Sequence, residues 1–109
     1  MEISFMVSGS APEPYEVTFL RTNEKVAAFC TCPAGENGQY CKHRLEIMEG
    51  RVAAIVSQNQ GEIGTVRAWL VGTELETALS EFRQAESIYE AAKTALGIAK
   101  KNLAKKMRG

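Results

Sequence analysis

The sequence lacks any long hydrophobic run and carries no excess of charge of either sign. Its longest apolar stretches cover five positions, as at 52–56, whereas a membrane-spanning helix needs about 20. The first residues include an acid, Glu2, and no basic segment, so no secretory signal is visible. Thirteen basic side chains balance 13 acidic ones over 109 residues, which argues against a strongly basic, non-specific nucleic-acid binder. We therefore expect a soluble, cytoplasmic chain of one domain with room for an appendage.

Cysteine and histidine are also scarce, with three cysteines and one histidine. All four of these residues lie between positions 30 and 43. In a reducing compartment, an odd number of thiols is more consistent with metal ligands or core residues than with disulfides. Their concentration in so short a segment indicates a shared role.

Proline and glycine are distributed unevenly, and this divides the chain into two parts. All three prolines and six of the nine glycines precede position 65, together with eight acids and five bases. Residues 65–109 have no proline, eight bases and five acids, and are rich in Ala, Glu, Lys and Leu, which favour helices. We expect an α+β fold, with a β-rich domain over 1–60 and a helical region over 61–109.

The first part carries the pattern of three short strands, at 3–7, 15–19 and 26–30. A loop containing Gly and Pro and a turn at 22–24 separate them, so a meander is the simplest sheet. Residues 33–40 indicate a loop by their Pro, Gly and Asn content. A short helix is expected to start near Lys42 and to stop at Gly50. The segment at 52–56 fits either a strand or a helix, and a further helix is expected at 63–70.

The cysteines and the histidine have the spacing of a metal site. Cys30, Cys32, Cys41 and His43 read C-x-C-x8-C-x-H, and three thiolates with one imidazole form a closed, structural zinc site. Ligand sulfurs lie a little under ~4 Å apart around tetrahedral zinc, whereas residues two apart on a straight strand are ~6.6 Å apart. The chain must therefore curl at Cys32, where Pro33 follows. Cys41 should just precede the helix, with His43 in its first turn.

This spacing resembles the SWIM-type zinc finger, whose pattern is C-x-C-x(n)-C-x-H. Pro33 and Lys42 match residues that are common in the family beside its ligands. The resemblance covers roughly residues 15–50 and implies a ββα finger that binds one structural Zn²⁺ through Cys30, Cys32, Cys41 and His43. Arg44 departs from the pattern, because the family usually has an apolar residue there. Members of the family are thought to bind DNA or proteins.

The end of the chain has the pattern of one long helix. Thr73 is an N-cap, and Glu76 completes a capping box. An a/d heptad repeat follows, with large residues at a and alanine at d. The a residues are Leu75, Phe82, Tyr89, Leu96 and Leu103, and the d residues are Ala78, Ala85, Ala92, Ala99 and then Lys106.

This heptad seam requires another helix to cover it, because residues 74–107 would span ~51 Å and a globule of about seventy residues has a radius of gyration of only ~11 Å. Acids dominate residues 74–90 and bases dominate residues 93–108. Two such helices attract when antiparallel and repel when parallel, so we expect an antiparallel homodimer. The alternative is a helix that folds back on its own domain.

These features favour a non-enzymatic zinc-binding interaction module with a protein partner and self-association through a coiled coil. No catalytic triad, paired carboxylates or phosphate loop is present, and the only histidine is assigned to the metal. The alternative is a small zinc-dependent regulator that binds DNA or another nucleic acid. Its binding face would consist of Lys42, Arg44, Arg51, Lys100, Lys101, Lys105 and Lys106.

Overall fold

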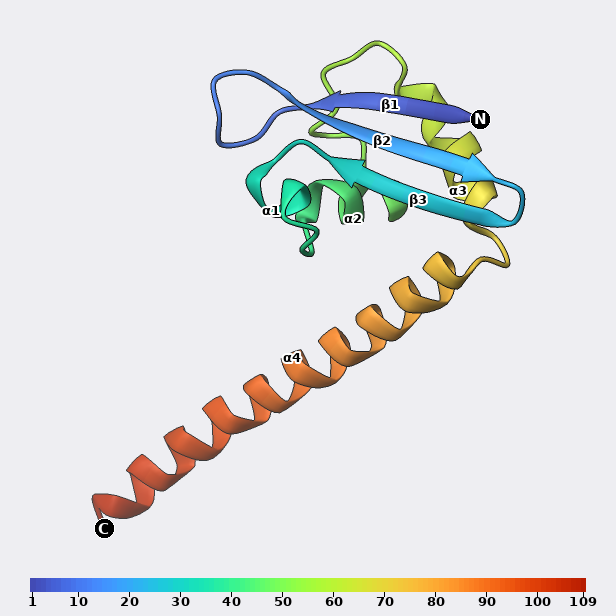
Figure 1. Cartoon of the computed structure of the whole chain (residues 1–109). Coiled ribbons are helices and arrows are strands. Elements are labelled where there is room, and N and C mark those ends of the chain that lie inside the picture. Colours follow the sequence, from blue (N-terminus) through green and yellow to red (C-terminus); the bar gives the residue numbers. More distant parts are fainter. The chain divides into compact units, whose positions relative to one another are not determined.

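The computed structural model describes all 109 residues and divides them into two compact units, Met1–Glu76 and Thr77–Gly109. The first unit contains an antiparallel sheet in the order β1-β2-β3 (Figure 1). Its strands are β1 (Glu2–Val7), β2 (Tyr15–Thr22) and β3 (Lys25–Cys30). The predicted three-stranded meander and the α+β class are confirmed.

Helices follow the sheet in the chain. They are α1 (Pro33–Glu36), α2 (Lys42–Met48), the 3₁₀ turn η1 (Gln60–Glu62), α3 (Ile63–Leu70) and α4 (Glu74–Met107). The short helix predicted to stop at Gly50 is α2, which ends at Met48. Gly50 has a φ of +85°, and a residue in this left-handed conformation commonly ends a helix. None of the helices combines the length and the apolar character that a membrane crossing requires.

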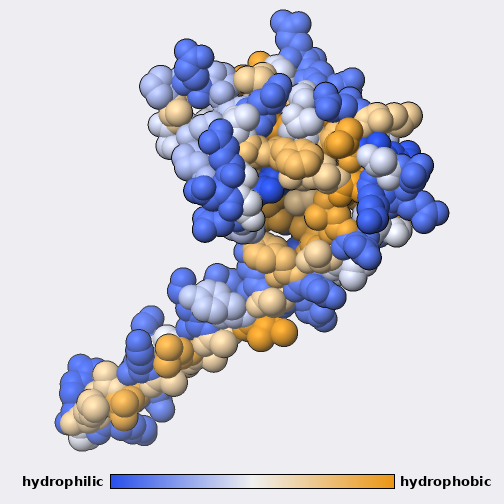
Figure 2. Space-filling view, viewed as in Figure 1, coloured by the Kyte–Doolittle hydropathy of each residue, from blue (hydrophilic) through white to orange (hydrophobic).

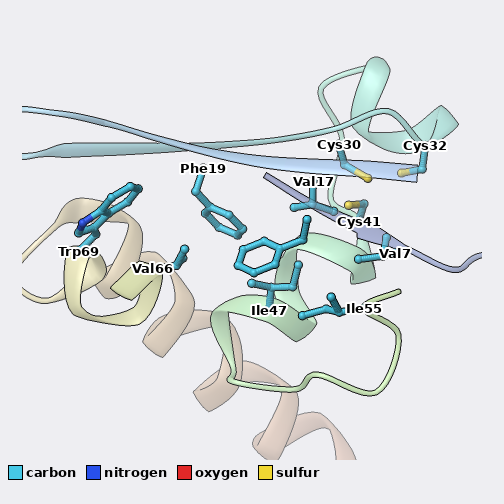
Figure 3. Packing of buried hydrophobic residues seen from close by; sticks show 11 residues of the cluster. Val7, Val17, Phe19, Cys30, Cys32, Cys41, Ile47, Ile55, Val66 and Trp69 are labelled. Atoms are coloured by element: carbon cyan, nitrogen blue, oxygen red, sulfur yellow. The ribbon is translucent and has the colours of Figure 1, made fainter. Parts of the chain in front are cut away.

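The core lies between one face of the sheet and the helices α2 and α3 (Figure 3). Strand alternation brings Phe5, Val17 and Cys30 into register across the three strands, so their side chains share the inner face. Phe5 and Phe19 pack edge to face with ring centroids 6.3 Å apart. The helices and the following loop complete this cluster with Ile47, Ile55, Val66 and Trp69.

The segment 51–57, for which strand and helix were both open, forms neither element. It contributes a single antiparallel bridge between Ile55 and Val7 of β1. The Val56 N–H donates to the Met6 carbonyl and the Ser8 N–H donates to the Ala54 carbonyl, both at 2.8 Å. The segment therefore covers the free edge of β1, which would otherwise expose unpaired backbone groups.

The loop predicted at 33–40 is only partly correct, because its first residues form the single-turn helix α1. Pro33 opens this turn, and proline is favoured at that position because its missing N–H needs no partner there. The sulfur of Cys32 caps the turn by accepting from the Gly35 N–H at 3.3 Å. The cap depends on a thiol, which is not among the common N-cap side chains.

The boundary between the two units falls after Glu76, later than the predicted boundary at residue 60. The physical reason is that α3 belongs to the core of the first unit, in which Val66 and Trp69 are buried. The predicted capping box at the start of α4 is present, with the Glu76 N–H donating to Thr73 Oγ1 at 3.2 Å. The Glu76 carboxylate accepts in return from the Gly72 N–H at 3.0 Å.

Helix α4 is continuous over 34 residues and has no buried residue. Its large apolar side chains are strongly exposed from Ile88 onward, including Tyr89 at 63% and Leu96 at 55%, whereas Leu75, Leu79 and Phe82 are half-buried. Figure 2 shows apolar side chains along this helix among hydrophilic ones. The single long helix that the heptad pattern predicted is therefore confirmed.

Candidate metal centre

The end of β3 positions the first two cysteines. Cys30 is the last residue of β3, and the next residue extends the pairing with β2, because the Thr31 N–H donates to the Glu16 carbonyl at 3.1 Å. The Thr31 hydroxyl accepts from the Glu16 N–H at 2.9 Å. The chain then turns into α1, and Cys32 is the N-cap of that turn. This is the predicted curl at Cys32.

The start of α2 positions the other two residues. Cys41 is the N-cap of α2, and its Sγ accepts from the Arg44 N–H at 3.5 Å. His43 lies in the first turn of the helix and is buried. Both placements agree with the prediction, because residues two apart point in nearly opposite directions within a helix and therefore reach one site only when the first precedes it.

The four side chains converge on one point. Each of Cys30, Cys32, Cys41 and His43 offers one ligand atom, and these atoms all lie within 4.8 Å of one another. Cys30 Sγ is 3.8 Å from His43 Nδ1, and Figure 3 shows the sulfurs of the three cysteines gathered beyond the end of β3. Ligand atoms around tetrahedral zinc are a little under ~4 Å apart, so small side-chain shifts bring the cluster to that geometry.

The chemistry of this donor set fits a closed structural zinc site. All four residues are buried, and three thiolates with one imidazole leave no coordination position for water. The three cysteines form no disulfide. When bound, zinc would cross-link the end of β3 to the start of α2 and supply folding free energy.

The imidazole of His43 is held by its surroundings on the side away from the thiols. Its Nδ1 faces Cys30, whereas its Nε2 is buried without a hydrogen-bond partner. The Tyr15 ring packs against it with centroids 5.2 Å apart. A Cβ at Gly9 would lie 3.1 Å from Nε2 and 2.5 Å from the Tyr15 ring, so only glycine leaves this ring pair undisturbed.

The electrostatic surroundings differ among the ligands. Burial raises the pKa of the Cys30 thiol to about 12. Burial acts in the same direction on Cys41, but the N–H and guanidinium of Arg44 outweigh it and hold the pKa of Cys41 below its ordinary value. Burial, with Lys42 nearby, lowers the pKa of His43 and favours the neutral imidazole that binds metals.

Arg44, the position that departs from the family pattern, turns toward the site. Its Nε–H donates to Cys41 Sγ at 3.1 Å, one terminal nitrogen donates to the Ala28 carbonyl at 3.2 Å, and the other donates to the Gln39 carbonyl. One guanidinium therefore joins a ligand, the outer edge of β3 and the loop before α2. The sequence offered no signal for this role beyond the basic residue itself.

The predicted nucleic-acid-binding residues fall into two groups. In the first unit, Lys42 is exposed, Arg44 is committed to the contacts above, and Arg51 pairs with Glu49 at 3.1 Å. The others lie exposed near the end of α4 and are Lys100, Lys101, Lys105 and Lys106.

Gly35 suits the turn predicted after Cys32, but its steric role could not be predicted from the sequence. A Cβ on it would lie 2.4 Å from the Cys30 carbonyl oxygen and 2.8 Å from the Cys30 Cβ. The close approach of α1 to the end of β3 therefore requires a residue without a side chain. The only sign of this requirement in the sequence is a glycine two residues after Pro33.

Comparison with known proteins agrees with this geometry. The family described as SWIM zinc finger matches residues 15–45. No curated protein and no solved structure matches the chain. The match spans β2, β3, α1 and the first half of α2, and thus includes all four clustered residues. Residues 15–45 of this chain are therefore a SWIM zinc finger, whose Cys₃His cluster is consistent with one structural Zn²⁺.

Proposed function

We propose that this chain is a non-enzymatic interaction module, in which a structural zinc finger is joined to a helix that binds a second copy of the chain. The observation that supports the proposal best is helix α4, which carries a regular apolar seam and leaves its large residues Tyr89, Leu96 and Leu103 exposed. The zinc finger supplies a small, rigid domain, and α4 supplies the surface for association.

The finger itself offers no basis for catalysis. A catalytic zinc keeps a coordination position for water or substrate, whereas the Cys₃His set supplies four protein ligands. The single histidine is one of the four. We infer a cytoplasmic location as well, because buried thiolate ligands persist in a reducing compartment.

The exposure of α4 supports association with another helix. Tyr89, Leu96 and Leu103 are each more than half exposed, although they repeat every seven residues along one face. Most helical stability in proteins comes from packing of an apolar face rather than from intrinsic propensity. A 34-residue helix with such a seam is therefore stabilised when a second helix covers it.

The order of charges along α4 supports an antiparallel arrangement. The helix begins with Glu74 and Glu76 in its first turn and ends with Lys105 and Lys106 in its last. This order suits the helix dipole, and it also places acidic half against basic half when two copies run in opposite directions. A parallel pair would place like charges together along the whole helix.

The runner-up function is nucleic-acid binding through the lysines at the end of α4. It has less support, because Arg44 and Arg51 of the proposed basic face have partners within the first unit. A mobility-shift titration with duplex DNA at low salt distinguishes the two proposals. Binding with a steep salt dependence favours the nucleic-acid reading, and no shift removes it.

Sedimentation velocity of the zinc-loaded chain over a range of concentrations tests the main proposal. We expect a dimer at tens of micromolar, with a mass that falls toward the monomer on dilution. Replacing Leu96 and Leu103 by Ser should abolish dimer formation while the finger keeps its zinc. A wild-type chain that remains monomeric at tens of micromolar contradicts the proposal.

A further inference from the structure

We propose that two copies of α4 pair antiparallel in one defined register, in which Tyr89 faces Ala92 of the second copy. This inference rests on the self-association proposed above and adds to it the alignment of the two helices. It follows from three features of α4: the alternation of large and small residues in the seam, the charges beside the seam, and the position of Ile88.

Steric fit is the first feature. In the proposed register, the large residues from Phe82 to Leu103 each lie opposite an alanine of the other helix, and Leu75 lies opposite Lys106. Helices with alanine at every second layer can approach closely, and the large side chains then fill the space on both sides. The facing pairs are Phe82 with Ala99, Tyr89 with Ala92, Leu96 with Ala85 and Leu103 with Ala78, and the two-fold symmetry generates each of them twice.

Charge beside the seam is the second feature, and it selects among alignments that differ by seven residues. A two-fold axis normal to the plane of the two helices brings the same edge of each helix together. Each alanine of the seam is followed by a residue at the next heptad position, called e, and these residues form one edge of the helix. The charged residues on this edge are Glu86, Lys93 and Lys100. In the proposed register, Glu86 lies between Lys93 and Lys100 of the second copy, so each glutamate has a lysine on both sides.

The shifted alignments lose this arrangement. A shift of seven residues in one direction places Glu86 beside Glu86 of the second copy. A shift in the other direction places Lys93 beside Lys93 of the second copy and leaves Glu86 with a lysine, Lys100, on one side only. Like charges at such distances destabilise the pair, and each shift also removes a layer of seam contacts.

Ile88 is the third feature. It is 67% exposed and lies at the g position, immediately before Tyr89 and on the opposite edge from Glu86. In the proposed register it lies between Ala95 and Ile88 of the second copy, at the centre of the dimer. The register therefore covers an apolar side chain that the seam alone leaves in water.

A charge-reversal series tests the register by sedimentation equilibrium at low ionic strength. Glu86→Lys should raise the dimer dissociation constant about tenfold, because it places a third lysine among the second copy's lysines. The triple variant Glu86→Lys, Lys93→Glu, Lys100→Glu inverts the whole edge and should restore the dissociation constant to within about threefold. Glu90→Lys is the matched control, because it makes the same charge change away from the seam and its two edges.

The outcomes separate the register from the proposed function. A parallel dimer brings Glu81 near Glu86 of the second copy, so Glu86→Lys would then tighten the dimer; this result overturns the antiparallel register and leaves self-association intact. A dimer that Glu86→Lys and Glu90→Lys weaken equally also overturns the register, since the effect would then be one of overall charge. A wild-type chain that never dimerises overturns both proposals. Circular dichroism of each variant checks that helix content is unchanged.

Discussion

The Nε–H of Arg44 donates a hydrogen bond to Cys41 Sγ at 3.1 Å. The same guanidinium contacts the carbonyl of Ala28 on the edge of β3. Three thiolates around a divalent zinc leave a net negative charge, and the positive charge of Arg44 lies against it. Arg44 is therefore placed to position a ligand and to compensate charge at the metal site.

The first prediction concerns Arg44. Arg44→Met keeps the length of the side chain and removes its hydrogen bonds, so we expect zinc affinity to fall by about 10- to 100-fold, as is usual for partners of metal ligands. Competition with a chromophoric chelator measures the affinity. The matched control is Lys42→Met, which removes an exposed charge two residues away. Equal affinities for the wild type and Arg44→Met would refute the role assigned to Arg44.

The second prediction concerns removal of zinc. We expect an excess of chelator to unfold the first unit, because the binding free energy of a structural zinc is folding free energy. Loss of near-ultraviolet circular dichroism from Trp69 and recovery on adding zinc back are the readouts. Native mass spectrometry should find one zinc per chain, and none in Cys41→Ser. A first unit that keeps its Trp69 signal without metal would contradict this prediction.

The third prediction concerns pH. Zinc must displace the proton of the Cys30 thiol, whose pKa is about 12 in the metal-free chain, so the zinc-bound folded state holds fewer protons than the unfolded state. Stability then increases with pH and is lost as pH falls. The lowered pKa of His43 delays proton competition at the imidazole to a more acidic pH than for a free histidine. We expect zinc affinity to increase steadily between about pH 6 and pH 8; an affinity that is flat over this range would argue against thiol ligation.

The fourth prediction concerns Gly35. Gly35→Ala places a Cβ 2.4 Å from the Cys30 carbonyl, and relief of such a clash requires backbone movement at a ligand. We expect the zinc-loaded chain to lose about 1–3 kcal/mol of unfolding free energy, the usual cost of overpacking. Urea unfolding measures the difference. Gly61→Ala is the control, because nothing lies within 4 Å of a Cβ there, and an equal effect of the two substitutions would rule out the steric explanation.

Much of the fold and of the site could be predicted because the signals are local. The strand alternation at 15–19, the Thr73–Glu76 capping box and the C-x-C-x8-C-x-H spacing each depend on residues close in the chain. Their structures follow from backbone periodicity and ligand chemistry. The predicted positions of Cys41 before α2 and His43 within it are correct for the same reason.

Other features depend on contacts between distant residues, and the sequence held no signal for them. The segment around Ile55 is neither strand nor helix, because its backbone groups pair with β1, almost fifty residues earlier. The first unit extends past residue 60 to Glu76 because Val66 and Trp69 fill a core made by the strands.

Residue spacing along the chain is enough to identify the four clustered residues, the order of the elements and the heptad seam of α4. The contacts that form on folding are needed to show that Arg44 serves the metal site instead of an exposed basic face, and that the turn after β3 leaves no room for a side chain at Gly35. A guanidinium takes the acceptors that folding places around it, and a glycine is required only where another backbone approaches closely.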